Sequence, residues 1–251
     1  FLYFSDLRTC KLHTWTPGKG VSTFRENDGE ANGNTLDIQG RLLTCEMGNR
    51  RVTRTELEGT LDGATRVLAN RWQGKRLNRT NDVVCRSDGL VYFTDPGMRT
   101  PKAERRLDFS GVFYISSGGQ VNLGTRELPY PNGLAFSPDE SILYVAVSRL
   151  DEGCIEEEEQ GKVCTHRFIQ AYDVARKGSL SNGRKFADMS SAEPGVPDGM
   201  KVDTEGRVFC TGNGGVCVFD TDGRQLGTIP TPEVTANCAF GGPDQKTLFL
   251  T

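Results

Sequence analysis

Five polar residues stand at one position of a repeated sequence pattern, and each has a side-chain oxygen that could bind a cation. The five are Asn32, Asn81, Asn132, Asp198 and Asn237. Amide and carboxylate oxygens, without His or thiolate at these positions, favour Ca²⁺, Mg²⁺ or Mn²⁺, with Zn²⁺ as an alternative. A cation held there would act as a Lewis acid toward a carbonyl group. One carboxylate supplies little charge for a divalent cation, so we expect a second acid in the set.

The same residues have a simpler interpretation, because Asn-Gly and Asp-Gly pairs are common in turns. Any one of the five is more often a turn residue or strand cap than a ligand. The recurrence of one polar type in five copies is what favours a shared site. A pure scaffold has no need for polar side chains at that position.

The repeat predicts the elements that must position these residues. Each copy begins with the polar residue, alternates as a strand, turns at an Asp, Gly or Pro cluster and returns as a second strand. Two further strands follow most copies, as in "RVTRTELEG" and "TRVLAN" after the first. Four-stranded units of about 40–50 residues are typical of propeller blades. The sequence therefore predicts an all-β fold, a six-bladed β-propeller of four-stranded antiparallel blades.

The two ends of the chain fit this repeat unevenly. "FLYFSD" at the start resembles the second strand of a copy, and "TLFLT" at the end closes another second strand. Five repeat starts and one implied start give the six blades. We therefore expect residues 1–251 to be a single propeller domain truncated at both ends. Its first blade would lack the inner strand and its last blade the outer strands.

Composition narrows the possible partners. The net charge is −3, and neither a basic stripe nor a long apolar run is present, so we expect no nucleic acid and no membrane as partner. Eight Cys occur without a C-x-x-C pair, which favours reduced thiols in a cytoplasmic protein. Cys154 and Cys164 could pair in an oxidising compartment, so a periplasmic or secreted protein is the alternative. The sequence does not indicate the oligomeric state.

Four stretches resemble the gluconolactonase and senescence-marker-protein (regucalcin) family: "TNDVVCRSDGLVYFTDP", "PNGLAFSPDESILYVA", "PDGMKVDTEGRVFCTGNGGVCVFD" and "ANCAFGGPDQKTLFLT". They recur in order over nearly the whole chain. The resemblance implies a six-bladed propeller with one catalytic divalent cation, Ca²⁺ before Mg²⁺, Mn²⁺ or Zn²⁺. It also implies hydrolysis of a small-molecule lactone, the reaction of a carboxylic-ester hydrolase.

The resemblance also implies roles for particular residues. Asn81, Asn132 and Asp198 match the metal ligands of the family, and Arg79 matches a substrate-binding Arg of its animal branch. The remaining ligand of the family, a Glu in an E-G-P motif, has no counterpart in the chain. This implies activity for a parent protein that carries the Glu, and leaves the activity of the 251 residues open.

The residues leave the mechanism and two rival functions open. Asp198 could ligate the metal and act as general base toward water, or attack directly as nucleophile. Asn32 and Asn237 would line the pocket and contact sugar hydroxyl groups, or contact channel water only. The rivals are a phosphotriesterase of the diisopropylfluorophosphatase type and a non-catalytic propeller that binds a protein. No G-x-S-x-G motif supports a serine esterase.

Overall fold

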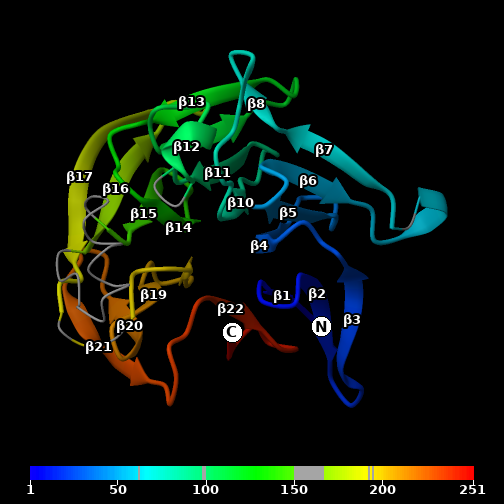
Figure 1. Cartoon of the computed structure of the whole chain (residues 1–251). Helices are drawn as coiled ribbons and strands as arrows, with labels where there is room; N and C mark the ends of the chain where they lie inside the picture. Colours follow the sequence, from blue (N-terminus) through cyan, green and yellow to red (C-terminus); the bar gives the residue numbers. More distant parts are fainter. Residues whose placement is uncertain (62, 98–99, 150–166, 192, 194) are drawn as a thin grey trace. The chain divides into compact units, whose positions relative to one another are not determined.

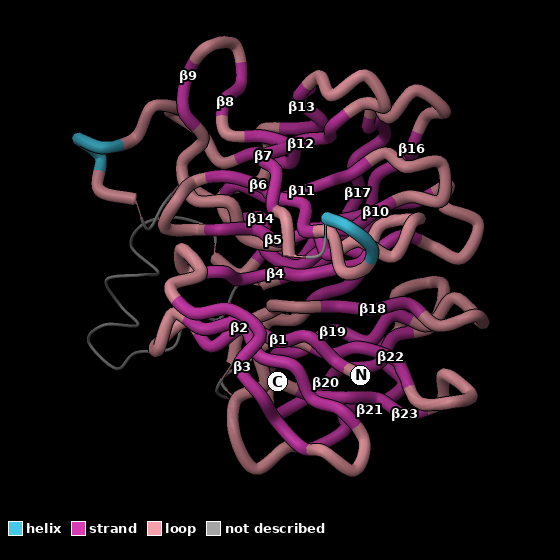
Figure 2. The backbone as a smooth tube through the Cα atoms, turned by 90° about the vertical axis from the view of Figure 1, so that its right-hand side faces the viewer, coloured by secondary structure: helices cyan, strands magenta, loops and turns pink. Residues whose placement is uncertain are grey.

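The computed structural model describes residues 1–61, 63–97, 100–149, 167–191, 193 and 195–251. Cys154 and Cys164, and with them the pair that they could form, lie outside the described residues. The chain divides into two compact units, residues 1–124 and 125–251, and each is described by itself. The described residues of both units form β-strands and turns, apart from the short 3-10 helices η1 (Gly59–Leu61) and η2 (Lys102–Glu104) in the first (Figure 2).

In the first unit the residues that the structure describes form four antiparallel sheets, whose strands pair in chain order (Figure 1). The strands of the three-stranded sheet are β1 (Leu2–Asp6), β2 (Lys11–Thr16) and β3 (Gly20–Glu26). Those of the next are β4 (Ala31–Leu36), β5 (Leu42–Glu46), β6 (Arg51–Thr55) and β7 (Thr65–Ala69). A hairpin of β8 (Arg71–Trp72) and β9 (Lys75–Arg76) follows. The last has β10 (Val83–Cys85), β11 (Val91–Asp95), β12 (Gly111–Ile115) and β13 (Val121–Thr125).

The described part of the second unit forms three antiparallel sheets, whose strands again pair in chain order. The first consists of β14 (Pro131–Phe136), β15 (Ile142–Val147), β16 (Phe168–Val174) and β17 (Leu180–Asp188). The second consists of β18 (Met200–Val202), β19 (Val208–Gly212), β20 (Gly215–Phe219) and β21 (Gln225–Pro230). The third pairs β22 (Cys238–Gly241) with β23 (Thr247–Leu250).

The antiparallel meander is the strand order of a propeller blade, which confirms the predicted all-β, blade-like repeat. The predicted number of six blades is not what the structure contains. The described residues form five sheets of three or four strands, and the remaining strands form the two hairpins β8–β9 and β22–β23. The physical reason is that β22 and β23 pair only with each other among the described residues, so this copy of the repeat builds a hairpin and no blade-sized sheet.

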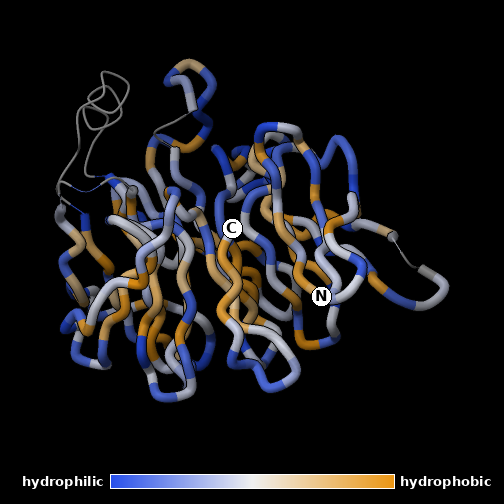
Figure 3. The backbone as a smooth tube through the Cα atoms, turned by 90° about the horizontal axis from the view of Figure 1, so that it is seen from below, coloured by the Kyte–Doolittle hydropathy of each residue, from blue (hydrophilic) through white to orange (hydrophobic). Residues whose placement is uncertain are grey.

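The alternating pattern of the sequence explains why these segments are strands. Their apolar residues lie along the strand interiors, whereas the turns between them are hydrophilic (Figure 3). The second strands are the exception: all five residues of β5 and all five of β11 are buried. Strands in which every residue is buried are covered on both faces. The mostly apolar sequences of β5 and β11 allow this. The polar residues at their ends are therefore buried as well.

Each unit has its own apolar core between neighbouring sheets. In the first unit the core includes Leu43, Val52, Phe93 and Phe113, with Trp72 of the unpredicted β8–β9 hairpin packed against it. In the second unit a separate set lies between the two four-stranded sheets: Ala135, Tyr144, Ala146, Ile169, Ala171, Ala187, Met189, Met200, Val208, Cys210, Cys217 and Phe219. The six described Cys are free thiols. Among the described residues, no helix has the length and apolar character needed to cross a membrane.

Candidate functional site

The repeated polar residues lie where the strands β4, β10, β14, β18 and β22 begin, each the first strand of its sheet, and none of the five has a positive φ. In β4 the pairing with β5 shifts register between Ala31 and Asn34, and in β14 it shifts between Pro131 and Leu134. The Asn32-Gly33 and Asn132-Gly133 pairs thus sit in bulges. A bulge changes the direction of a side chain at the end of a strand, and such bulges are common beside functional sites.

Glycine follows three of these residues because neighbouring first strands approach closely there. A Cβ at Gly133 would lie 2.0 Å from the carbonyl oxygen of Asp198, and one at Gly33 would lie 2.6 Å from the Cα of Asp82. Neither glycine has a positive φ, so close contact requires glycine at both positions. Each glycine brings one repeat start against the next within its unit.

A hydroxyl group connects two of the predicted ligands in the second unit. The amide nitrogen of Asn132 donates to Ser148 Oγ at 2.9 Å, and Ser148 Oγ donates to the carbonyl oxygen of Pro197 at 2.5 Å. Asn132 is 4% exposed and Ser148 is fully buried. Because Pro197 directly precedes Asp198, the hydroxyl of Ser148 fixes the Asn132 amide and the chain entering Asp198 together.

The backbone around Asp198 is held by the adjacent strand β19. Asp198 N donates to the carbonyl oxygen of Thr211 at 3.2 Å, and Thr211 N donates to that of Gly199 at 2.9 Å. The buried Thr211 hydroxyl also lies 3.1 Å from the Gly199 carbonyl and 3.0 Å from that of Ala236. Asp198 itself is half-buried. Its carboxylate is thus carried on a rigid backbone at the partly exposed end of a strand.

Asn237 occupies a different register position from Asp198. Cys238 pairs with Leu250, just as Met200 pairs with Cys210, so Asn237 corresponds to Gly199. Its Oδ1 accepts from Cys238 N at 2.8 Å. A Cβ added at Gly199 would lie only 2.1 Å from this Oδ1, so the Asn237 amide packs directly against Gly199. These contacts make Asn237 a packing partner of the strand that carries Asp198.

In the first unit, Asn81 is buried between two strands. Its N–H donates to the carbonyl oxygen of Thr94 at 2.8 Å, and its own carbonyl accepts from Gly33 N at 2.8 Å. The structure thereby places Asn32 and Asn81 on neighbouring strands. Asp82, 5% exposed, occupies the register position of Gly199, since Val83 pairs with Phe93.

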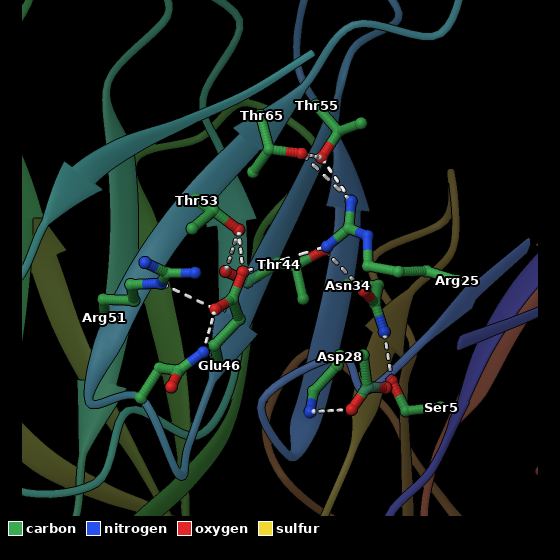
Figure 4. Close-up of polar contacts among 12 residues, drawn as sticks. Ser5, Arg25, Asp28, Asn34, Thr44, Glu46, Arg51, Thr53, Thr55 and Thr65 are labelled. Atoms are coloured by element: carbon green, nitrogen blue, oxygen red, sulfur yellow. Dashed lines mark hydrogen bonds and ion pairs between the residues drawn. The ribbon is translucent and has the colours of Figure 1, made fainter. Parts of the chain in front are cut away.

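Asn32 is half-buried, and its backbone is fixed by polar side chains; Figure 4 shows Ser5, Asn34 and Thr44 of this group. Its carbonyl oxygen accepts from Ser5 Oγ at 2.8 Å and from Asn34 Nδ2 at 2.7 Å. Asn34 Oδ1 in turn accepts from Thr44 Oγ1 at 2.9 Å. Asn34 therefore ties β4 to β1 and β5, a role that the sequence did not reveal.

Arg79 lies in a loop that two buried residues hold in place. Asp95 is fully buried, and its carboxylate accepts from Asn78 N at 2.8 Å and from Arg79 N at 2.6 Å. The Asn78 amide donates to the carbonyl oxygens of Leu107 and Phe109 at 3.0 and 3.1 Å. The side chain of Arg79 forms an ion pair with Glu30, Nη2 to Oε2 at 2.9 Å.

Burial dominates the titration of Asp95. Desolvation raises its pKa to about 6, against the opposing effect of the two N–H groups that it accepts. The carboxyl is therefore close to a change of charge at a mildly acidic pH. Because it anchors the loop of Arg79, this titration is coupled to the candidate site.

A second buried carboxylate joins the first two sheets (Figure 4). Glu46 is 2% exposed, and its Oε2 accepts from Arg51 Nε at 2.6 Å and from Asn49 Nδ2 at 2.7 Å. Its Oε1 accepts from Thr53 Oγ1 at 3.0 Å and lies 3.8 Å from Arg25 Nη1. This buried ion pair is well hydrogen-bonded, as a charge removed from water requires. It fixes β3 against β5 and β6.

The donor atoms fit a hard cation in type. In the part of the chain that the structure describes, no group of three or more His, Cys, Asp or Glu could hold a metal ion. The predicted set relies instead on one carboxylate and on amide oxygens. Since Ser148 engages the nitrogen of the Asn132 amide, the buried amide oxygen faces away from that hydroxyl. Oxygen donors of this kind suit Ca²⁺ or Mg²⁺.

Sequence reasoning missed the residues that hold the site: Ser148, Asp95, Asn78 and Asn34. One signal for Asp95 was present, because the second strands "LYFSD", "LLTCE" and "VYFTD" all end in an acid. Glu46 and Asp95 are both buried acids at that position. Nothing in the local sequence marks Ser148, whose partners lie 16 and 49 residues away.

The sheets are blade-like meanders, and their first strands begin with polar residues where neighbouring first strands contact each other. This arrangement defines the β-propeller class of proteins. The model of the family described as "SMP-30/Gluconolactonase/LRE-like region" matches residues 1–251, and the chain belongs to that family. The resemblance noted from the sequence is thereby confirmed.

Individual relatives are similar over the whole chain. A gluconolactonase of Zymomonas mobilis is 31% identical, covering 100% of this chain and 72% of the relative. The pentonolactonase XacC of Haloferax volcanii is 30% identical, covering 100% of this chain and 76% of the relative. The solved structure of a gluconolactonase from Xanthomonas campestris superposes with a TM-score of 0.82 at 38% identity, covering 99% of this chain and 78% of that chain.

Proposed function

We propose that the chain is a lactonase that hydrolyses a small sugar lactone, as its named relatives indicate for themselves. The observation that carries the proposal is the buried Ser148 hydroxyl, which holds both the Asn132 amide and the segment entering Asp198. A buried polar group with two specific partners orients ligands for chemistry, as the supporting residues of a metal site do. Two lactonases among the relatives, of hexonate and pentonate type by name, support a sugar-sized substrate.

We assign Asn81, Asn132 and Asp198 as ligands of a divalent cation, Ca²⁺ before Mg²⁺, Mn²⁺ or Zn²⁺. Such an ion, when bound, supplies Lewis acidity at the lactone carbonyl. The amide ligands add no charge, so Asp198 is the only anionic member of the assigned set. Arg79 and Asn32 contact the hydroxyl groups of the sugar. Asn237 is the weakest candidate for a contact with the sugar hydroxyl groups, because its amide oxygen already accepts from Cys238 N.

Asp198 has one of two roles in the proposal. As general base it takes a proton from the attacking water. As nucleophile its carboxylate attacks the lactone carbonyl carbon, the ring C–O bond breaks, the ring oxygen leaves as a hydroxyl group, and a mixed anhydride between Asp198 and the acyl group remains for water to hydrolyse. A single turnover in H₂¹⁸O separates the two. With Asp198 as nucleophile, ¹⁸O enters its own carboxylate when water attacks the Asp198 carbonyl of the anhydride. With Asp198 as base, the label appears only in the product acid.

A substrate panel tests the proposal against its rivals. Purified protein is treated with chelator, divided, and returned to Ca²⁺, Mg²⁺, Mn²⁺ or Zn²⁺. Hydrolysis of D-glucono-1,5-lactone, D-xylono-1,4-lactone and diisopropyl fluorophosphate is then followed by proton release. The proposal predicts lactone hydrolysis that chelation abolishes and a cation restores. Faster hydrolysis of the organophosphate would favour the phosphotriesterase, and no hydrolysis of any substrate would favour a binding module.

A further inference from the structure

A small polar pocket lies in the first unit where the β3–β4 turn, the β5–β6 turn and the segment before η2 meet. Its volume is about 180 Å³. That is room for several water molecules, since one water needs at least about 10–15 Å³. The residues that line it are Glu30, Met47, Gly48, Arg50, Arg79, Thr100, Pro101 and Glu104. Only Met47 and Pro101 among them contribute an apolar side chain.

Glu30 forms one wall and is fixed from several sides. Its backbone has φ +57°, which is unusual for a residue other than glycine, and its carbonyl oxygen accepts from Met47 N at 3.0 Å. A Cβ at Gly48 would lie 3.0 Å from the Glu30 carboxyl carbon, so glycine there leaves room for the carboxylate. The β3–β4 and β5–β6 turns therefore hold this carboxylate in a defined place.

Two ion pairs balance the charge of the pocket. Arg79 Nη2 donates to Glu30 Oε2 at 2.9 Å, and Arg50 Nη2 donates to Glu104 Oε2 at 2.8 Å. Arg50 Nη1 also donates to the carbonyl oxygen of Glu104 at 3.1 Å. Each guanidinium has five N–H donors, so both retain donors beyond these bonds. The walls thus combine cationic donors and anionic acceptors without net charge.

Two lining residues have buried polar atoms with no hydrogen-bond partner among the described residues. They are Nε of Arg79 and Oγ1 of Thr100. Thr100 is 1% exposed, and its backbone is satisfied by Gly97 and by the Arg105 side chain, whose Nε donates to its carbonyl oxygen at 2.7 Å. A buried polar atom without a partner is costly, by about 1–3 kcal/mol, and calls for water or a ligand.

We propose that this pocket binds adjacent hydroxyl groups of a neutral polyhydroxylated ligand. A hydroxyl both donates and accepts, so it can pair with Arg donors, Glu acceptors and the Thr100 hydroxyl at once. Two carboxylates in the wall disfavour an anion, two guanidinium groups disfavour a cation, and the scarcity of apolar lining disfavours a hydrocarbon. The choice of ligand class rests on the proposed lactonase function, since a sugar lactone carries such hydroxyls.

The test uses a ligand that cannot be hydrolysed and a protein freed of metal. Binding of 1,5-anhydro-D-glucitol to chelator-treated protein is titrated by NMR chemical-shift changes, with D-gluconate as the anionic probe. The variants are Thr100→Val, which removes the hydroxyl at nearly constant volume, Thr100→Ser, which restores it, and Glu30→Gln. Glu26→Gln, at an exposed ion pair with Lys11, is the matched control. Thermal melts show that each variant is folded.

We expect saturable binding of the neutral probe and weaker binding of gluconate. Thr100→Val should weaken binding about fivefold, the loss of one hydrogen bond, and Thr100→Ser should restore it. Glu30→Gln should weaken it as well, and Glu26→Gln should not. The proposal would be overturned if Thr100→Val bound the neutral probe as tightly as the unaltered protein does. It would also be overturned if gluconate bound more tightly than the neutral probe. Binding without lactone hydrolysis would support the pocket while contradicting the lactonase function.

Discussion

At the scale of single residues, the candidate site depends on buried groups that bind no substrate themselves. Ser148 is the clearest of them, because its one hydroxyl satisfies the Asn132 amide and the Pro197 carbonyl. Sequence reasoning found Asn132 and Asp198 from their repeated spacing. It could not find Ser148, since its role depends on the approach of two segments that are distant in the chain.

Ser148→Ala should impair both stability and the site. The change leaves a buried N–H donor and a buried carbonyl acceptor without their partner, which costs about 1–3 kcal/mol of unfolding free energy. Chemical denaturation measures this, and lactone hydrolysis should fall together with cation affinity. Ser22→Ala is the control, because Ser22 is exposed and, among the described residues, its hydroxyl bonds only with the half-buried Thr14 hydroxyl. A Ser148→Ala variant as stable and active as the control would contradict the assigned role.

Asp95 gives the protein a pH dependence of defined sign. Its pKa is raised from 3.8 to about 6, so between these values the folded state keeps a proton that the unfolded state has released. Rising pH therefore favours unfolding in this window and has no further effect above it. The Asp95 contribution to the unfolding free energy should fall by on the order of 3 kcal/mol from pH 4 to pH 6.

The comparison that isolates this effect is between the protein and its Asp95→Asn variant, denatured at a series of pH values. Asn does not titrate. The unfolding free energy of the protein minus that of the variant should therefore decrease from pH 4 to pH 6 and then stay constant. A difference that rises with pH in this range would mean that the two N–H donors outweigh burial. Carbon NMR of the Asp95 carboxyl gives the pKa directly.

At the scale of elements, the sequence predicted most strands because their alternation and their turns are local properties. The first strand of each four-stranded sheet begins within two residues of the repeat position that the spacing indicated. The β8–β9 hairpin was missed, since four strand residues give no pattern to detect. The register of Asn237 was also beyond the sequence: sliding "ANCAFG" by one residue against "PDGMKV" changes which side of the strand carries the amide, and only strand pairing decides this.

Because neighbouring first strands are in close contact, we expect substitution by Ala to have very different effects on stability at two glycines of the second unit. Gly133→Ala would put a Cβ 2.0 Å from the Asp198 carbonyl oxygen, whereas a Cβ at Gly227 meets no atom within 4 Å. Gly133→Ala should therefore lower the unfolding free energy by about 2 kcal/mol and displace Asp198, with loss of lactone hydrolysis. Gly227→Ala should change stability by less than about 0.5 kcal/mol. If both variants melt and react alike, the strands are not in contact as described.

At the scale of the whole molecule, the chain is a series of antiparallel meanders with a separate core in each unit. The stability of such a repeat comes from packing between neighbouring sheets, while its chemistry comes from polar residues where the first strands begin. The fold could therefore be predicted from periodicity alone. The number of blade-sized sheets could not, because it depends on which strands find partners.

The central claim is that Asp198 belongs to the reacting centre of a lactonase. The most direct measurement is the initial rate of D-glucono-1,5-lactone hydrolysis by the protein, by Asp198→Asn and by the control Asp222→Asn, an exposed turn residue of the same unit. All three are assayed at equal cation concentration and shown to be folded. We expect Asp198→Asn to lose at least about 100-fold in rate and Asp222→Asn to keep the rate of the unaltered protein. Hydrolysis by Asp198→Asn at the rate of the unaltered protein would contradict the central claim.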